Sequence, residues 1–208
     1  MKKAGFTLAE ILITLAIVGI IAALVIPSLT TKASRQAEAS KLSSIVADLE
    51  NSFSNLMTEE DTDNLFTVID NGAKLRNHLN YTDSNTLNGS KPFKTLGGST
   101  SNESISGTAY TLKNNAKVMI SNESTNSNDT SLENKYRIIF IDTNDSGKPG
   151  KWGRDGFCYL VGDSGKLYPR GGEYYKNITG ASSTDACSGS DGLGCAYTLF
   201  RNNYKVDY

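Results

Sequence analysis

One carboxylate, Glu10, lies inside an otherwise uncharged apolar run near the start of the 208-residue chain. A charge in a membrane segment is costly and is usually kept for a function, so it needs a partner or a proton. The chain has no Lys, Arg or His between Lys3 and Lys32. The partner must therefore come from another chain or from a new amino terminus. Cleavage after Gly5 would create a positive amine at Phe6, one helical turn from Glu10, and pairing between neighbouring subunits would then drive polymerisation.

The run from Phe6 to Ile26 is long enough to cross a membrane. At ~1.5 Å per residue its roughly 21 residues just span a hydrocarbon core of ~30 Å. Lys2 and Lys3 precede the run, so the positive-inside rule keeps the N-terminus in the cytoplasm and places everything after Pro27 outside. An ordinary cleaved signal peptide is the weaker interpretation, because no A-x-A site follows and the helical pattern continues.

The motif Gly-Phe-Thr-Leu-Ala-Glu at 5–10, with the apolar run and Pro27 after it, resembles the class III signal of type IV prepilins and of pseudopilins. The resemblance is close over roughly the first 30 residues and only in outline beyond them. It implies that a prepilin peptidase cuts between Gly5 and Phe6 and methylates the Phe6 amine. It also implies that Glu10 aids docking into a growing filament. Pro27 stands where many relatives carry a proline that lets the helix kink or melt, since proline removes one helical hydrogen bond.

The resemblance and the patterning predict four segments: a cleaved leader at 1–5, a transmembrane and assembly helix at 6–27, an amphipathic half of the same helix at 28–57, and a globular pilin-like head at 58–208. Apolar residues at three- to five-residue steps predict the amphipathic half, namely Ala33, Ala37, Leu42, Ile45, Leu49, Phe53 and Leu56. The expected fold class is α+β, with the long N-terminal helix packed on a small antiparallel β-sheet.

Short apolar and β-branched runs predict the strands of this sheet, at Thr108–Lys113, Ala116–Ser121, Tyr136–Ile141, Phe157–Val161 and Leu167–Tyr168. Leu65–Asp70 and Ala73–Leu79 resemble short helices on either side of an Asn-Gly pair. The polar stretch Thr82–Ser106, which contains several glycines and a proline, predicts a long loop.

The three cysteines lie in the last third of the chain. A disulfide between Cys187 and Cys195 is the preferred pairing, which implies an oxidising compartment outside the cytoplasm and leaves Cys158 as a free thiol. The alternatives are a bond from Cys158 to either of the other two, or three free thiols. The C-x7-C spacing is not typical of a zinc site.

A weak calcium candidate lies in the segment that opens D-x-N-x-S-G, where Asp142, Asn144, Ser146 and Asp155 supply oxygen ligands. An EF-hand is excluded because the twelfth loop position is Gly153 rather than an acid. The favoured interpretation is a structural loop like that of pilin-like domains, in which Asp and Asn side chains bond nearby backbone amides. No cofactor is expected otherwise.

The pattern predicts a non-enzymatic structural subunit. The sequence has one His and no G-x-S-x-G, H-E-x-x-H or phosphate-loop motif, and its net charge of −1 comes without a basic stripe for nucleic acid. The expected function is a subunit of a type IV pilus or pilus-like filament. The alternatives are a pseudopilin of a type II secretion or competence system, and a membrane-anchored binding domain with a prepilin-type anchor.

The resemblance also implies where the chain resides and what it meets. Before assembly it is expected to be a single-pass protein of the cytoplasmic (inner) membrane with its head outside, and afterwards part of a surface or periplasmic filament. The expected partners are copies of itself, other pilins, the prepilin peptidase, the assembly platform and, before assembly, the membrane.

Overall fold

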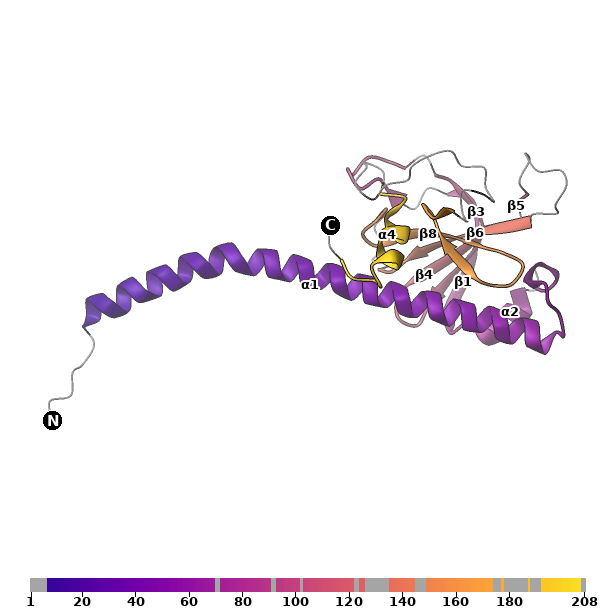
Figure 1. The fold of residues 1–208 in the computed structure, drawn as a ribbon, viewed down its shortest axis with the longest axis horizontal. Coiled ribbons are helices and arrows are strands. Elements are labelled where there is room, and N and C mark those ends of the chain that lie inside the picture. The colour runs from indigo at the N-terminus through magenta and orange to yellow at the C-terminus, as the bar shows by residue number, and fades with distance from the viewer. Residues whose placement is uncertain are drawn as a thin grey trace.

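The computed structural model describes residues 7–69, 72–90, 93–101, 103–121, 124–125, 135–144, 149–173, 177, 187 and 192–206. One long helix, α1 (Leu8–Glu59), carries a head formed by the rest of the chain. Figure 1 shows the first half of α1 projecting alone and the second half lying along the head. At ~1.5 Å per residue the 52 residues of α1 extend for about 78 Å.

Pro27 lies inside α1 without ending it. The hydroxyls of Thr30 and Thr31 donate to the carbonyls of Ile26 and Pro27 at 2.9–3.1 Å, so this turn keeps extra hydrogen bonds. The helix therefore continues through the proline as one gently arched element (Figure 1). Two separate helical halves, which a proline break would give, are not observed.

Burial on α1 starts where the head begins. The buried residues of the helix are Ala39, Leu42, Ile45, Leu49, Ser52, Phe53 and Leu56. The predicted apolar stripe is thus confirmed from Leu42 onward, whereas Ala33 and Ala37 are exposed. The prediction was wrong at these two alanines because the head meets this part of α1 through other residues, such as Gln36, whose side chain bonds the C-terminal segment.

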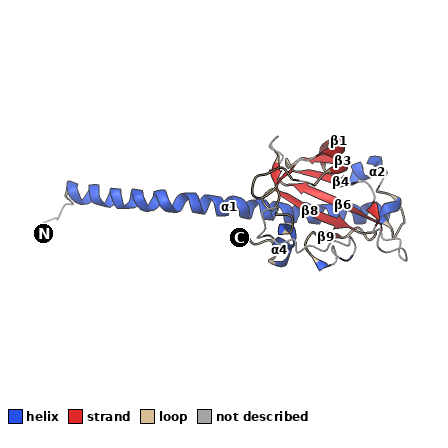
Figure 2. Cartoon of the chain, turned by 90° about the horizontal axis from the view of Figure 1, so that it is seen from above, coloured by secondary structure: helices blue, strands red, loops and turns tan. Residues whose placement is uncertain are grey.

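The head contains a seven-stranded sheet whose main path runs in the order β1-β3-β4-β6-β8-β9. Every pair on this path is antiparallel, and the helix lies across one face of the sheet (Figure 2). The strands of the path are β1 (Tyr81–Ser90), β3 (Ile105–Leu112), β4 (Lys117–Ser121), β6 (Lys135–Asp142), β8 (Gly156–Val161) and β9 (Leu167–Pro169). The α+β architecture expected from the sequence is therefore confirmed.

Short elements complete the head. β5 (Ser124–Thr125) pairs with β6, and β2 (Phe93–Lys94) forms a separate parallel pair with β7 (Gly150–Lys151). The helical elements are η1 (Leu65–Thr67), α2 (Gly72–His78) and α4 (Cys195–Arg201). The first two fall where short helices were predicted; α4 was not predicted.

Both faces of the central sheet are buried. Phe157, Tyr159 and Val161 of β8 pack with α1 in one core, while Cys158 and Leu160 face a second core on the opposite side. The second core is closed by aromatic residues outside the main sheet: Phe93 and Trp152 stack with ring centroids 4.2 Å apart. The sequence prediction of a sheet covered by the helix accounts for only one of these two layers.

The predicted loop Thr82–Ser106 is wrong over much of its length. It contains β1, which is ten residues long and pairs with β3 from Tyr81↔Leu112 to Ser90↔Ile105. The strand is at the sheet edge and its described side chains are exposed or half-buried, so no apolar alternation marks it. Its conformation comes from pairing with β3 rather than from local side-chain preference.

Substitution of Phe53 by Ala should destabilise the head by about 3–5 kcal/mol, because a fully buried aromatic side chain is removed from the helix–sheet core. Urea unfolding of the detergent-solubilised chain, followed through the fluorescence of the single, buried Trp152, measures the change. Leu24→Ala, on the exposed half of the same helix, is the matched control and should leave the midpoint unchanged. Equal effects of the two substitutions would contradict this assignment of the core.

Candidate functional site

The first half of α1 exposes a continuous apolar surface. Each large apolar side chain from Leu8 to Leu29 is between 45% and 80% exposed, namely Leu8, Ile11, Leu12, Ile13, Leu15, Ile17, Val18, Ile20, Ile21, Leu24, Val25, Ile26 and Leu29. Soluble monomers rarely expose so large an apolar patch. By length and composition α1 is able to cross a membrane. This apolar surface must therefore be buried, either in lipid or against other helices.

Glu10 is held at the start of this surface by a reciprocal capping box. The backbone N–H and the hydroxyl of Thr7 both donate to Oε2 of Glu10 at 2.8 Å. In return, the Glu10 N–H donates to Oγ1 of Thr7 at 3.3 Å. This arrangement satisfies two donors at the helix N-terminus, and the carboxylate also lies at the positive end of the helix dipole.

The capping box corrects the expectation that all partners of Glu10 come from another chain or a new terminus. Thr7, within the same chain, supplies two hydrogen bonds to one carboxylate oxygen. The T-x-x-E spacing is a recognised capping-box signature, so the sequence contained the signal. Thr7 carries no positive charge, so the Glu10 carboxylate can still pair with a cation.

Gly5 and Phe6 lie outside the described residues, so cleavage between them and methylation of Phe6 remain predictions. Their proposed relation to Glu10 is likewise a prediction. Pro27 is described as part of α1, and its role in filament packing also remains a prediction.

The disulfide Cys187–Cys195 is present, and Cys158 is buried in the second core outside any disulfide. Cys195 is also the first residue of α4, so the bond ties this helix to the segment before it. Two glycines fit against this region: a Cβ at Gly153 would lie 2.4 Å from Sγ of Cys195, and one at Gly192 would lie 2.4 Å from the Trp152 carbonyl. The disulfide thus packs directly against the turn between β7 and β8.

The candidate calcium residues take part in loop hydrogen bonds. Oδ1 of Asp142 accepts the Asn144 N–H at 2.9 Å, and Oδ1 of Asp155 accepts the Lys151 N–H. Ser146 lies outside the described residues. The part of the chain that the structure describes contains no group of three or more His, Cys, Asp or Glu able to hold a metal. These contacts are those of the structural loop, and calcium binding remains only a prediction.

The N-terminal segment matches a known family model. Residues 1–26 match the prokaryotic N-terminal methylation motif, a prepilin-type motif typical of type IV pilins and pseudopilins. No curated protein and no solved structure matches the chain. The motif coincides with the exposed apolar half of α1 and its Glu10, and together with the pilin-like fold it suggests a type IV pilin or pseudopilin.

Substitution of Gly153 by Ala should destabilise the head by about 2–4 kcal/mol, because the residue has φ +77° and its added Cβ meets the disulfide. Gly89→Ala is the matched control, since Gly89 has φ +61° but no atom within 4 Å of an added Cβ. Urea unfolding of both variants separates the steric effect from backbone strain. Equal losses in the two variants would show that contact with Cys195 is unimportant.

Proposed function

We propose that the protein is a structural subunit of a bacterial type IV pilus or pilus-like filament, polymerised through the first half of α1. The observation that carries the proposal is a helix half that is exposed and apolar on all sides, with one acid near its beginning and a folded head at its end. The methylation motif over the same residues supports it.

The energetics of assembly follow from this surface. In the membrane, lipid covers Leu8–Leu29, and the head lies outside. A prepilin peptidase removes residues 1–5 and leaves a methylated amine at Phe6. In the filament, helices of neighbouring subunits replace lipid around the apolar surface, so van der Waals packing and polar contacts decide the association. The Phe6 amine of one subunit and the Glu10 carboxylate of another form the polar link.

A pseudopilin of a type II secretion or competence system is the alternative within the same class. It would use the same apolar helix and the same polar link in a shorter filament. A membrane-anchored binding domain is the alternative from another class. It is disfavoured by Glu10, since a simple anchor needs no carboxylate in its membrane segment and the capping contact with Thr7 supplies no counter-charge.

Substitution of Glu10 by Ala should strongly reduce entry into filaments while leaving membrane insertion intact. Loss of a charge-assisted contact of about 1.5–3 kcal/mol corresponds to an association weaker by roughly 10- to 150-fold. The amount of chain in the sheared filament fraction, relative to the membrane fraction, measures the effect.

Thr14→Ala is the control within the same segment, because the Thr14 hydroxyl donates to the Ile11 carbonyl of its own helix at 2.9 Å. It should assemble like the unmodified chain. Unchanged filament entry of the Glu10 variant would remove the main physical support for polymerisation through this residue.

A further inference from the structure

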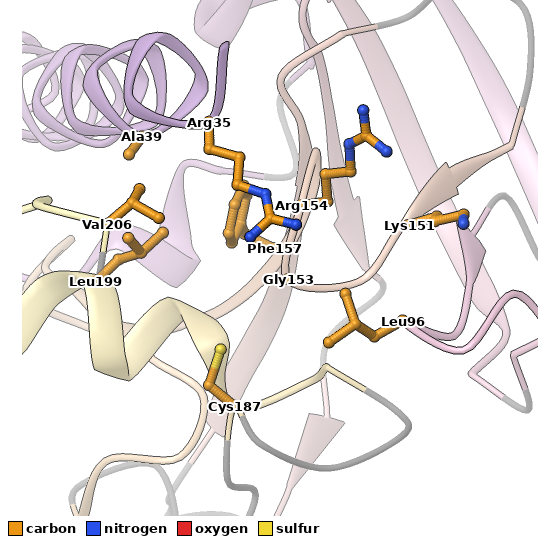
Figure 3. A pocket seen from close by; sticks show the side chains of 10 residues that line it. All are labelled: Arg35, Ala39, Leu96, Lys151, Gly153, Arg154, Phe157, Cys187, Leu199 and Val206. Atoms are coloured by element: carbon orange, nitrogen blue, oxygen red, sulfur yellow. The ribbon is translucent and has the colours of Figure 1, made fainter. Parts of the chain in front are cut away.

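A cavity of about 400 Å³ lies where α1 meets the end of the head from which the apolar helix emerges. Its walls come from α1, the turn between β7 and β8, α4 and the C-terminal segment (Figure 3). The lining residues are Arg35, Ala39, Leu96, Lys151, Gly153, Arg154, Phe157, Cys187, Leu199 and Val206. Figure 1 shows α4 and the C-terminus at this same end of the head.

The ionisable side chains that the structure describes in the cavity lining are all basic. They are Arg35, Lys151 and Arg154, because Cys187 is tied in the disulfide. Figure 3 shows the Arg35 side chain reaching from α1 alongside Phe157, with Lys151 and Arg154 coming from β7 and the turn after it. A concave surface lined by cations favours an anion, and Arg binds phosphate oxygens with paired hydrogen bonds.

The remaining walls are mostly apolar and fixed. Phe157 and Leu199 are buried members of the helix–sheet core, and they close one side of the cavity. Gln36 fixes the C-terminal wall, since its side-chain amide donates to the Tyr204 carbonyl at 2.9 Å and accepts the Val206 N–H at 3.1 Å. A ligand that suits these walls has both an anionic group and apolar parts.

The position on α1 indicates the source of that ligand. Arg35 follows Leu29, the last large exposed apolar residue of the helix, by six residues, or about 9 Å along the axis. Helical side chains lean toward the N-terminus, so Arg35 leans toward the membrane side. The headgroup layer on each side of a bilayer is about 5–8 Å thick, which places the cavity beside it.

We propose that this cavity binds the phosphate headgroup of an anionic phospholipid in the outer leaflet while the subunit waits in the membrane. The inference rests on the proposed membrane stage and extends it. The cations take the phosphate, and the apolar walls take the glycerol and the first carbons of the chains. The contact orients the head on the bilayer and is lost when the subunit leaves for a filament.

The test compares the full-length chain in nanodiscs of phosphatidylcholine alone and of phosphatidylcholine mixed equally with phosphatidylglycerol. The readout is hydrogen exchange at the amides of 151–154 and 199–206. Phosphatidylglycerol should slow exchange there by about tenfold, as expected for ligand linkage and for basic residues near an anionic surface. The double variant Lys151→Ala/Arg154→Ala should lose this protection.

The matched control is Lys113→Ala/Lys166→Ala, which removes the same charge from exposed sites elsewhere on the head. Lys113 lines a different cavity beside Asn51 and Asn55, about 24–30 Å along α1 from Arg35. The control should keep full protection, and both double variants should retain the urea midpoint of the parent chain. Equal loss of protection in the two double variants would mean that the head is attracted to any anionic surface, and would overturn the proposed site.

Three further outcomes would also overturn the proposal. If chains that insert normally show no phosphatidylglycerol effect, the lipid site is overturned and the proposed filament function is unaffected. Equal protection by inorganic phosphate in phosphatidylcholine discs would make the ligand free phosphate. Protection that appears only in filaments would assign the cavity to an acidic segment of a neighbouring copy. Failure of α1 to insert at all, seen as protease access to both ends, would instead contradict the membrane stage itself.

Discussion

The apolar surface of α1 between Leu8 and Leu29 must always be covered, and this constraint organises the rest of the molecule. The segment buries none of its large apolar side chains against the described head. Its cover must come from lipid or from other chains, because water is an unfavourable neighbour for so much apolar area. In the proposed function, neighbouring helices replace lipid around this surface when the subunit moves from the membrane into a filament.

The second half of the same helix packs against the head. Its buried stripe completes the core on one face of the sheet, while Phe93, Trp152 and their neighbours complete the other. Polar contacts fix the position of the helix: Glu50 accepts the Leu167 N–H at 2.9 Å, and Lys41 donates to the Thr143 carbonyl. One continuous helix therefore joins the apolar segment to the head, even through Pro27.

The sequence predicted those features whose cause is local. The stripe from Leu42 to Leu56 follows from helical periodicity, and β6 follows from its run of branched and aromatic residues. The strand β1 was missed because its polar residues are extended only through pairing with β3. The second core was missed because Phe93 and Trp152 come from separate short segments that only the tertiary fold brings together.

The same division applies to the candidate site. The apolar run and Glu10 are plain in the sequence, and the preferred pairing Cys187–Cys195 was predicted. The capping contact of Thr7 was not predicted although its spacing is local, because an uncharged amide and hydroxyl supply it rather than a cation. The cation-lined cavity had no sequence signal, since Arg35 and Arg154 are more than a hundred residues apart.

In the proposed function, the apolar half of α1 passes from lipid into a filament as a processed helix. Mass spectrometry of the native protein in sheared surface filaments and in membranes tests it most directly. The expected result is a chain that begins at methylated Phe6 in the sheared fraction. The same processed chain found only in the envelope would favour a pseudopilin. An unprocessed chain confined to the membrane would contradict the account and leave an anchored domain.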